Sequence, residues 1–256
     1  MTRIPTRRAA ALLFLAFSLH AGAALAADLK VLSTIALTDA WHELKPMFEA
    51  RGHKLELALQ TSGALGKRIE AGETGDIIVS TTAGVAQLEK SGKALAGTSK
   101  ALAGSAIGVA VLKGAPKPDI STVDAFRQTL LAARSVAYSD PAGGGASGAY
   151  FSKVLERLGI AQQVNAKARL GRGVRNADAV VRGDSDIAIQ QIPELVAASG
   201  VDIIGPFPGD LHNVTAFSAA VLASSKDAAA AKALVDFLAS PEAAAVLKAK
   251  GFELNR

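Results

Sequence analysis

Apolar positions along the chain follow two spacings in turn, and this predicts alternating strands and helices. In the segment 37–50, Leu37, Trp41 and Phe48 fall on one face of a helix, because residues three or four positions apart share a helical face. The elements expected in this region are strands at 29–32, 55–59 and 76–80 and helices at 37–50, 64–71 and 83–89. Such an alternation predicts a parallel sheet that is covered by helices on both faces.

A second α/β unit is expected from residue 106 onward. Its expected elements are strands at 106–112, 135–138, 164–168, 186–189 and 201–204 and helices at 122–132, 148–158 and 174–181. The apolar stretch 214–222 then returns to the first unit, and the last two expected elements are helices at 227–238 and 241–250. The fold class is therefore α/β, with parallel-rich sheets that have helices on both faces.

The order of these units predicts two lobes with a hinged cleft. Residues 27–103 and 211–256 form the first lobe, and residues 104–210 form a second, inserted lobe. The chain is expected to cross between them near residues 97–106 and 209–216, with a ligand held between the lobes. One continuous doubly wound domain is the alternative.

The first 26 residues have the pattern of a cleavable signal peptide. Arg3, Arg7 and Arg8 precede an apolar run at 9–19, and an A-x-A signal at 24–26 predicts cleavage near Ala26. The run is too short to span a bilayer. We therefore expect a protein exported to the periplasm and not embedded in a membrane.

Charge and composition exclude several functions. The leader holds three arginines and no acidic residue, so its removal lowers the formal net charge from +5 to +2, which is no nucleic-acid signature. The chain has no cysteine, so it has neither disulfides nor a thiolate metal site. The histidines, His20, His42, His53 and His212, lack metal-ligand spacing. No metal or cofactor is expected.

Polar turns after the predicted strands indicate an anion site. The glycine-rich stretch 139–150 joins a strand to a helix N-terminus, where backbone N–H groups have no partner within the helix. In parallel sheets ligands bind at the carboxyl ends of the strands, where the turns 33–36 and 60–63 also lie. The candidate ligand-binding residues of these turns are Ser33, Thr34, Thr61, Ser62, Ser147 and Gly148.

Several short motifs resemble those of the periplasmic molybdate-binding proteins of ABC transporters. They are Thr61-Ser62-Gly63-Ala64-Leu65, Asp76-Ile77-Ile78-Val79-Ser80, Asp140-Pro141, Ser147-Gly148-Ala149-Tyr150 and Val174-Arg175. The resemblance covers essentially the whole chain after the leader. It implies the two-lobed type II solute-binding fold, a monomer, a small anionic ligand and an ABC permease as partner.

The same resemblance implies which positions hold the ligand. Proteins of this family bind molybdate through hydroxyls and backbone N–H groups, without charged side chains. Their first-turn serine falls on Ala36, and their second serine is kept as Ser62. Ser147 stands in place of an alanine, Val174 matches the valine whose N–H binds, and Gln191 replaces a tyrosine.

Basic residues near one predicted helix N-terminus favour a different anion. Arg169, Arg172 and Arg175, with Lys167 beside them, crowd this region. A guanidinium suits planar carboxylates because it binds them through two parallel hydrogen bonds. We therefore expect a solute-binding protein that holds a dicarboxylate or tricarboxylate, rather than a molybdate-type oxyanion, for an ABC importer. The alternative for these cations is an ordinary solvated surface.

An enzyme on the same scaffold is the other hypothesis, because the chain also resembles aconitate isomerase. That activity interconverts trans- and cis-aconitate by an allylic proton shift, which needs a tricarboxylate clamp and a group that transfers the proton. His212 and Glu194 are the candidates for this group. A histidine in a loop is more often an ordinary surface residue.

Overall fold

The computed structural model describes residues 27–254, so the predicted leader lies outside the described residues. Its strands are β1 (Asp28–Thr34), β2 (Lys54–Gln60), β3 (Ile77–Thr81), β4 (Lys100–Leu112), β5 (Val136–Ser139), β6 (Ala168–Gly171), β7 (Ile187–Gln191), β8 (Val201–Pro206) and β9 (Val214–Val221). Its α-helices are α1 (Thr38–Glu49), α2 (Ser62–Glu70), α3 (Thr82–Lys90), α4 (Val123–Ala132), α5 (Ala146–Arg157), α6 (Ala161–Asn165), α7 (Ala177–Val181), α8 (Ile192–Val196), α9 (Ala228–Leu238) and α10 (Pro241–Ala249). The short 3-10 helices η1 (Ile35–Leu37) and η2 (Gly209–Leu211) follow β1 and β8.

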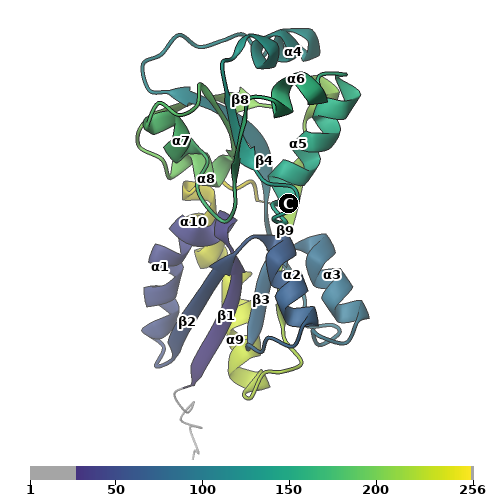
Figure 1. The fold of residues 1–256 in the computed structure, drawn as a ribbon. Helices are drawn as coiled ribbons and strands as arrows, with labels where there is room; N and C mark the ends of the chain where they lie inside the picture. The colour runs from purple at the N-terminus through teal and green to yellow at the C-terminus, as the bar shows by residue number, and fades with distance from the viewer. Residues whose placement is uncertain (1–26, 255–256) are drawn as a thin grey trace, which may run out of the picture.

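The strands form a lower and an upper group that β4 joins (Figure 1). The sheet order is β2-β1-β3-β9-β4-β7-β5-β6, with β8 also paired to β4. The first half of β4 pairs with β9, and its second half pairs with β7 and β8. β1 is parallel to β2 and β3, and β5 is parallel to β6 and β7. The carboxyl ends of these parallel strands therefore face the space between the two groups.

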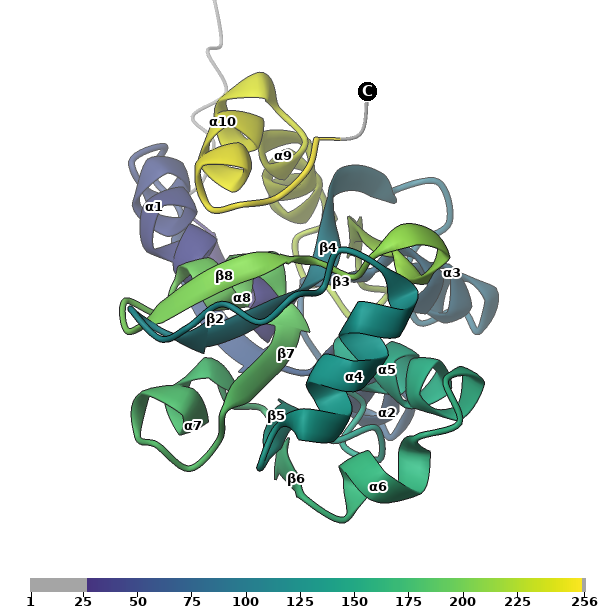
Figure 2. The same cartoon turned by 90° about the horizontal axis from the view of Figure 1, so that it is seen from above.

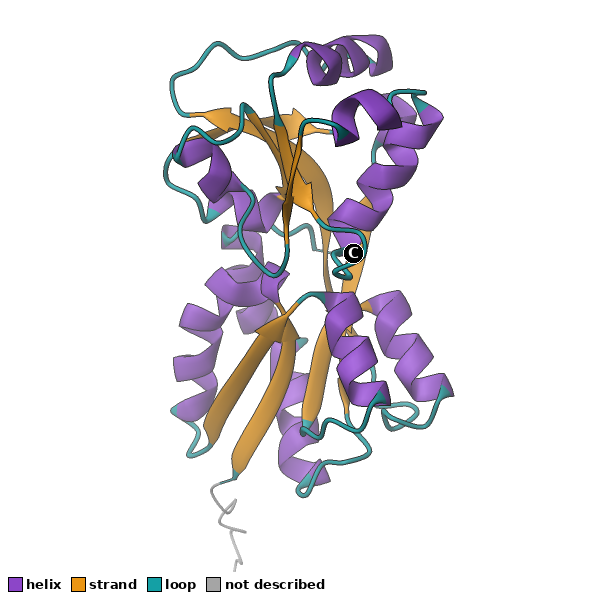
Figure 3. Cartoon of the chain, viewed as in Figure 1, coloured by secondary structure: helices purple, strands orange, loops and turns teal. Residues whose placement is uncertain are grey.

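Hydrophobic clusters fill both faces of each group of strands. In the lower group, α1, α9 and α10 pack on one face and α2 and α3 on the other (Figure 3). In the upper group, α4 and α5 pack on the face opposite to α7 and α8 (Figure 2). The lower clusters draw on residues 29–103 and 217–252, and the upper clusters draw on residues 107–211. We call these two bodies lobe 1 and lobe 2; the residue boundaries given above for the lobes stay a prediction.

Three details differ from the expectation from sequence. The predicted strand at 164–168 is divided between the end of α6 and the start of β6, because Val164 is buried on the helix α6. The helix expected from Val174 begins at Ala177, so Val174 lies in the preceding loop. Strand β4 begins at Lys100 rather than at residue 106, because its first residues pair with β9.

No helix between residues 27 and 254 combines the length and the apolar character that crossing a bilayer requires.

Candidate ligand-binding site

A narrow cavity of about 20 Å³, which we call the central cavity, lies between the two lobes. Its walls are formed by the ends of β1, β2, β5 and β7, by the start of the helices that follow them, and by Phe217 of β9. The lining residues are Thr34, Ile35, Ala36, Thr61, Ser62, Ser139, Gly145, Ala146, Ser147, Gln191, Glu194 and Phe217. Four strands that lie far apart in sequence thus end at one point, as the rule for ligand sites in α/β sheets predicts.

The N-terminus of α5 supplies the amide groups on the lobe 2 side. The first intrahelical bond runs from the Ala149 amide to Gly145 O at 2.9 Å, so the amides of the preceding helical residues have no intrahelical acceptor. Gly148 lets the helix approach β5, because a Cβ there would lie 1.7 Å from Ser139 O. Ser147 is buried, and its Oγ lies 3.4 Å from the Oγ of Ser139. This end of the cavity is therefore rich in donors for an anion.

The N-terminus of α2 faces α5 from lobe 1, and its groups are partly occupied. Thr61 caps the helix by accepting the Ala64 amide, and its Oγ1 donates to Gly143 O at 2.6 Å. The Gly63 amide donates to Gly144 O at 3.0 Å, which a positive φ of 77° at Gly144 makes possible. The two lobes therefore touch through this helix end, and Ser62 is left to face the cavity.

Glu194 is the ionisable residue of the central cavity. It lies in the first turn of α8, and its Oε1 accepts a hydrogen bond of 2.5 Å from the side chain of Gln190. Burial raises the pKa of its carboxyl to about 8, although hydrogen bonds from Gln190 and Gln191 and the charge of Arg175 favour the ionised form. Near neutral pH this carboxyl can therefore both take up and release a proton.

A second cavity of about 290 Å³, the outer cavity, adjoins the first and shares Ile35, Ala36 and Glu194 with it. Val174 and Arg175 line it from lobe 2, and His42 lines it from α1. Glu194 thus lies where the two cavities meet.

The remaining cations and the loop histidine do not line the central or the outer cavity. Arg169 is exposed on β6, and Arg172 forms an ion pair with Asp140 at 2.5 Å. Lys167 donates to carbonyl groups at the end of α4, namely Leu131 O and Ala133 O. His212 is exposed after η2. The guanidinium cluster expected from the sequence is therefore dispersed, because β6 and the loop after it direct these side chains to other partners.

Two predicted residues are buried with protein partners. Ser33 accepts a hydrogen bond of 2.8 Å from the indole N–H of Trp41. Gln191 donates through Nε2 to Thr215 Oγ1 at 2.9 Å, and its buried Oε1 has no partner among the described residues. Since Gln191 lines the central cavity, the free end of its amide is available to a bound molecule.

Sequence reasoning missed the buried polar residues behind this wall. Ser139, Asn176 and Gln190 are all at most 5% exposed and are hydrogen-bonded to one another. The signal that could have revealed them is their position: Ser139 and Gln190 are polar residues at the ends of strands that are otherwise mostly apolar. Buried polar side chains of this kind need partners, which indicates a network.

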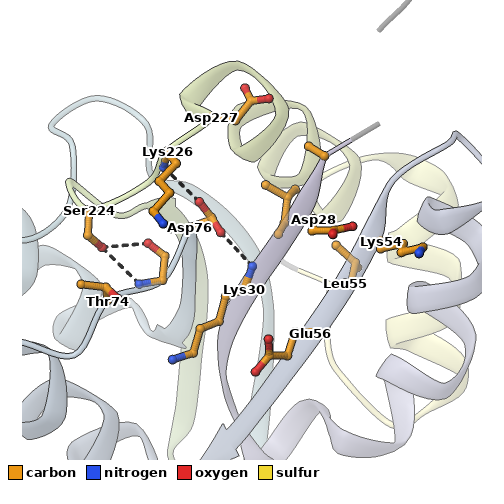
Figure 4. Close-up of a pocket in the computed structure, with 13 residues that line it drawn as sticks. Asp28, Lys30, Lys54, Leu55, Glu56, Thr74, Asp76, Ser224, Lys226 and Asp227 are labelled. Atoms are coloured by element: carbon orange, nitrogen blue, oxygen red, sulfur yellow. Dashed lines mark hydrogen bonds between the residues drawn. The ribbon is translucent and has the colours of Figure 1, made fainter. Parts of the chain in front are cut away.

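A wider cavity of about 660 Å³ lies at the other end of lobe 1, at the amino ends of β1 and β2 (Figure 4). Some of its polar groups bind one another: Asp76 accepts the Lys30 amide, and Ser224 bonds to the backbone of Gly75. It lies away from the carboxyl ends of the strands, where ligands bind in α/β sheets, so the interlobe cavities are the better candidate site.

A model of the bacterial extracellular solute-binding protein family matches residues 29–253. The chain belongs to this family. Among its relatives, an aconitate isomerase of Pseudomonas sp. is 36% identical over 98% of this chain and 97% of that protein. The molybdate-binding protein ModA of Escherichia coli (strain K12) is 29% identical over 92% of this chain and 93% of that protein.

Solved structures of other solute-binding proteins have the same fold. The periplasmic molybdate-binding protein of Azotobacter vinelandii superposes with a TM-score of 0.74 at 21% identity, over 89% of this chain and 100% of that one. The sulfate-binding protein SubI of Mycobacterium tuberculosis H37Rv superposes with a TM-score of 0.72 at 21% identity, over 88% of this chain and 86% of that one. The α/β type II periplasmic binding fold expected from the sequence is thereby confirmed.

Proposed function

We propose that this protein is an isomerase of a small unsaturated tricarboxylate and that it interconverts trans- and cis-aconitate, the activity for which its Pseudomonas relative is named. The observation that carries the proposal is Glu194, a half-buried carboxyl at the junction of both interlobe cavities with a pKa raised to about 8. An anion that is held only by hydroxyls and backbone amides does not need a titratable carboxyl beside it. A proton-transfer enzyme needs such a group.

The reaction needs one proton to move between two carbon atoms. Ionised Glu194 removes a proton from the methylene carbon beside a carboxylate, and the electron pair of that bond becomes the new double bond. The former double bond then takes the same proton back at its far carbon. Atoms and charge balance without another reactant, and the pKa of Glu194 lies close to neutral pH, where such transfer is efficient.

With the lobes moved apart to admit the substrate, its carboxylates would meet the neutral donors that line the central cavity. The first-turn amides of α5 and the hydroxyls of Ser62 and Ser147 would bind one carboxylate, in the manner of anions at helix N-termini. Arg175 in the outer cavity is placed for another carboxylate. Thr34, Thr61, Gly148 and Gln191 complete the proposed binding wall.

A receptor for a small anion is the second candidate. The central cavity has no lysine or arginine in its lining, and hydroxyls and amides dominate it. This composition suits an oxyanion held by neutral donors, and a molybdate-binding relative supports it. In this case the protein, exported to the periplasm after cleavage near Ala26, would deliver its ligand to an ABC permease.

One experiment separates the two functions. The purified protein is mixed with trans-aconitate, and cis-aconitate is quantified by chromatography at several protein concentrations. We expect a rate proportional to protein concentration, with Glu156→Gln, an exposed glutamate on α5, as the active control for Glu194→Gln. No interconversion, together with a large thermal shift by molybdate or sulfate, would identify the receptor.

A further inference from the structure

The Glu194 carboxyl is held by an amide from the neighbouring strand. Gln190 lies on β7 and is fully buried. Its Nε2 donates to Val174 O at 3.1 Å and to Glu194 Oε1 at 2.5 Å, and its Oε1 accepts the Asn176 amide at 2.7 Å. Both polar atoms of the Gln190 side chain thus have protein partners. The residue lies behind the wall of the central cavity and does not line the cavity itself.

The orientation of this amide follows from its backbone partners. The peptide N–H of Asn176 can only donate, and the carbonyl of Val174 can only accept. Gln190 must therefore direct its oxygen at Asn176 and its nitrogen at Val174 and Glu194. An amide is otherwise ambiguous between two flipped positions. Here the reversed position would lose both backbone hydrogen bonds.

We infer that Gln190 is a positioning residue: it holds Oε1 of Glu194 as a permanent acceptor, so that the proton which is exchanged with the substrate is always carried by Oε2. This inference rests on the proposed isomerase function. A carboxyl without such an anchor could rotate and present either oxygen. Holding one of them leaves a single reactive atom in a fixed direction, which is what repeated transfer between two carbons requires.

The same network connects Glu194 to the anion-binding end of the cavity. Asn176 Nδ2 donates to Ser139 Oγ at 3.1 Å. The Oγ atoms of Ser139 and Ser147 lie 3.4 Å apart. Gly171 makes room for Asn176, because a Cβ there would lie 2.2 Å from Asn176 Oδ1. The proton-transfer group and one binding hydroxyl are therefore fixed by one continuous buried chain of hydrogen bonds.

Few charges face Glu194 besides this anchor. Arg175 and Asp178 face the outer cavity from lobe 2, and Asp39 and His42 face it from α1. Asp39 pairs with Lys250 at 3.2 Å, and Arg175 lies 3.8 Å from Asp178. Since Gln190 donates to the carboxyl, its removal should make the ionised form of Glu194 less stable and raise the pKa of this group.

The test compares Gln190→Met with Gln162→Met, an exposed glutamine on α6 that serves as the matched control. The pKa of Glu194 is measured by carbon NMR of protein labelled at the glutamate carboxyl, with Glu194→Gln to assign the signal. We expect Gln190→Met to raise this pKa by about one unit, a tenfold change in the ionisation constant. We also expect kcat for aconitate to fall about tenfold with KM within threefold.

An unchanged pKa and pH profile in a folded Gln190→Met protein would overturn the inference. If this variant does not fold, Gln190→Asn replaces it, because the shorter amide keeps a polar group but cannot reach Glu194. An inactive wild-type protein would refute the proposed function, whereas the NMR comparison would still decide whether Gln190 anchors the carboxyl.

Discussion

Two carboxyl groups follow neighbouring strands of lobe 2, and their surroundings act in opposite directions. Asp140 follows β5, where hydrogen bonds from Arg172 and the Ala142 amide lower the pKa of its side chain. Glu194 follows β7, where burial raises its pKa to about 8. Asp140 therefore stays ionised and orders the glycine loop, whereas Glu194 is the group that we propose to transfer the proton. Position at the end of a strand does not by itself give a carboxyl its role.

The comparison predicts that Glu194→Gln has the largest effect. The amide keeps the hydrogen bond from Gln190 but cannot accept a proton, so isomerisation of trans-aconitate should fall about 10³-fold. Steady-state rates measure this loss. Retention of more than a tenth of the activity would mean that another group transfers the proton.

The same substitution should stabilise the fold. In the folded protein the pKa of Glu194 is about 8, above the ordinary value of 4.5. The contribution of this group to stability is therefore greatest below pH 4.5 and is lost as the pH rises from 4.5 to 8. Glu194→Gln removes this dependence, and Tm at pH 8 should rise by roughly 5 °C. Thermal unfolding at several pH values provides the measurement, and a pH-independent Tm difference would contradict the assigned cause.

The arginines beside the two carboxyls form a matched pair. Arg175→Ala removes the cation of the outer cavity, so KM for aconitate should rise about tenfold, and the pKa of Glu194 should increase. Arg172→Ala removes the partner of Asp140 and should leave KM nearly unchanged. Initial-rate kinetics of both variants distinguish these outcomes. An equal change of KM in the two variants would contradict the different roles assigned to Arg175 and Arg172.

A smaller effect is expected when Asp140 is replaced. Asp140→Asn loses the ion pair with Arg172, and the glycine loop should become less stable. The pKa of Asp140 in the folded wild-type protein lies below the ordinary value of 3.8. The ion pair therefore stabilises the wild type above pH 3.8, and this stabilisation is lost as the pH falls below that value. The Tm difference from the wild type should therefore shrink in acid, and the pH profile of activity should not move.

The smallest effect concerns the binding hydroxyls. Ser147→Ala and Ser62→Ala should each weaken ligand binding about threefold to tenfold, the contribution of one hydrogen bond, without unfolding the protein. Calorimetric titration with the aconitate isomers, or with molybdate, measures the affinity. Wild-type affinity in both variants would place the ligand elsewhere.

Much of the fold could be predicted from local patterns. The spacing of Ala40, Trp41, Leu44 and Phe48 marks α1, and the alternation of strands and helices gives the layered α/β architecture. The limits of β6 and α7 could not be predicted, because the burial of Val164 and the loop that holds Val174 depend on tertiary contacts.

The sequence by itself determined which turns follow the strands, and hence the candidate residues Thr34, Ser62 and Ser147, while the resemblance to known families added Gln191 and Glu194. These turns depend on short-range chemistry, namely glycines, caps and apolar spacing. Only the tertiary structure decided that Arg169 and Arg172 point away from the cavities while Arg175 lines one of them, and that Gln190 is hydrogen-bonded to Glu194. The direction of a side chain, and the pKa that burial gives it, arise from contacts between segments far apart in the chain.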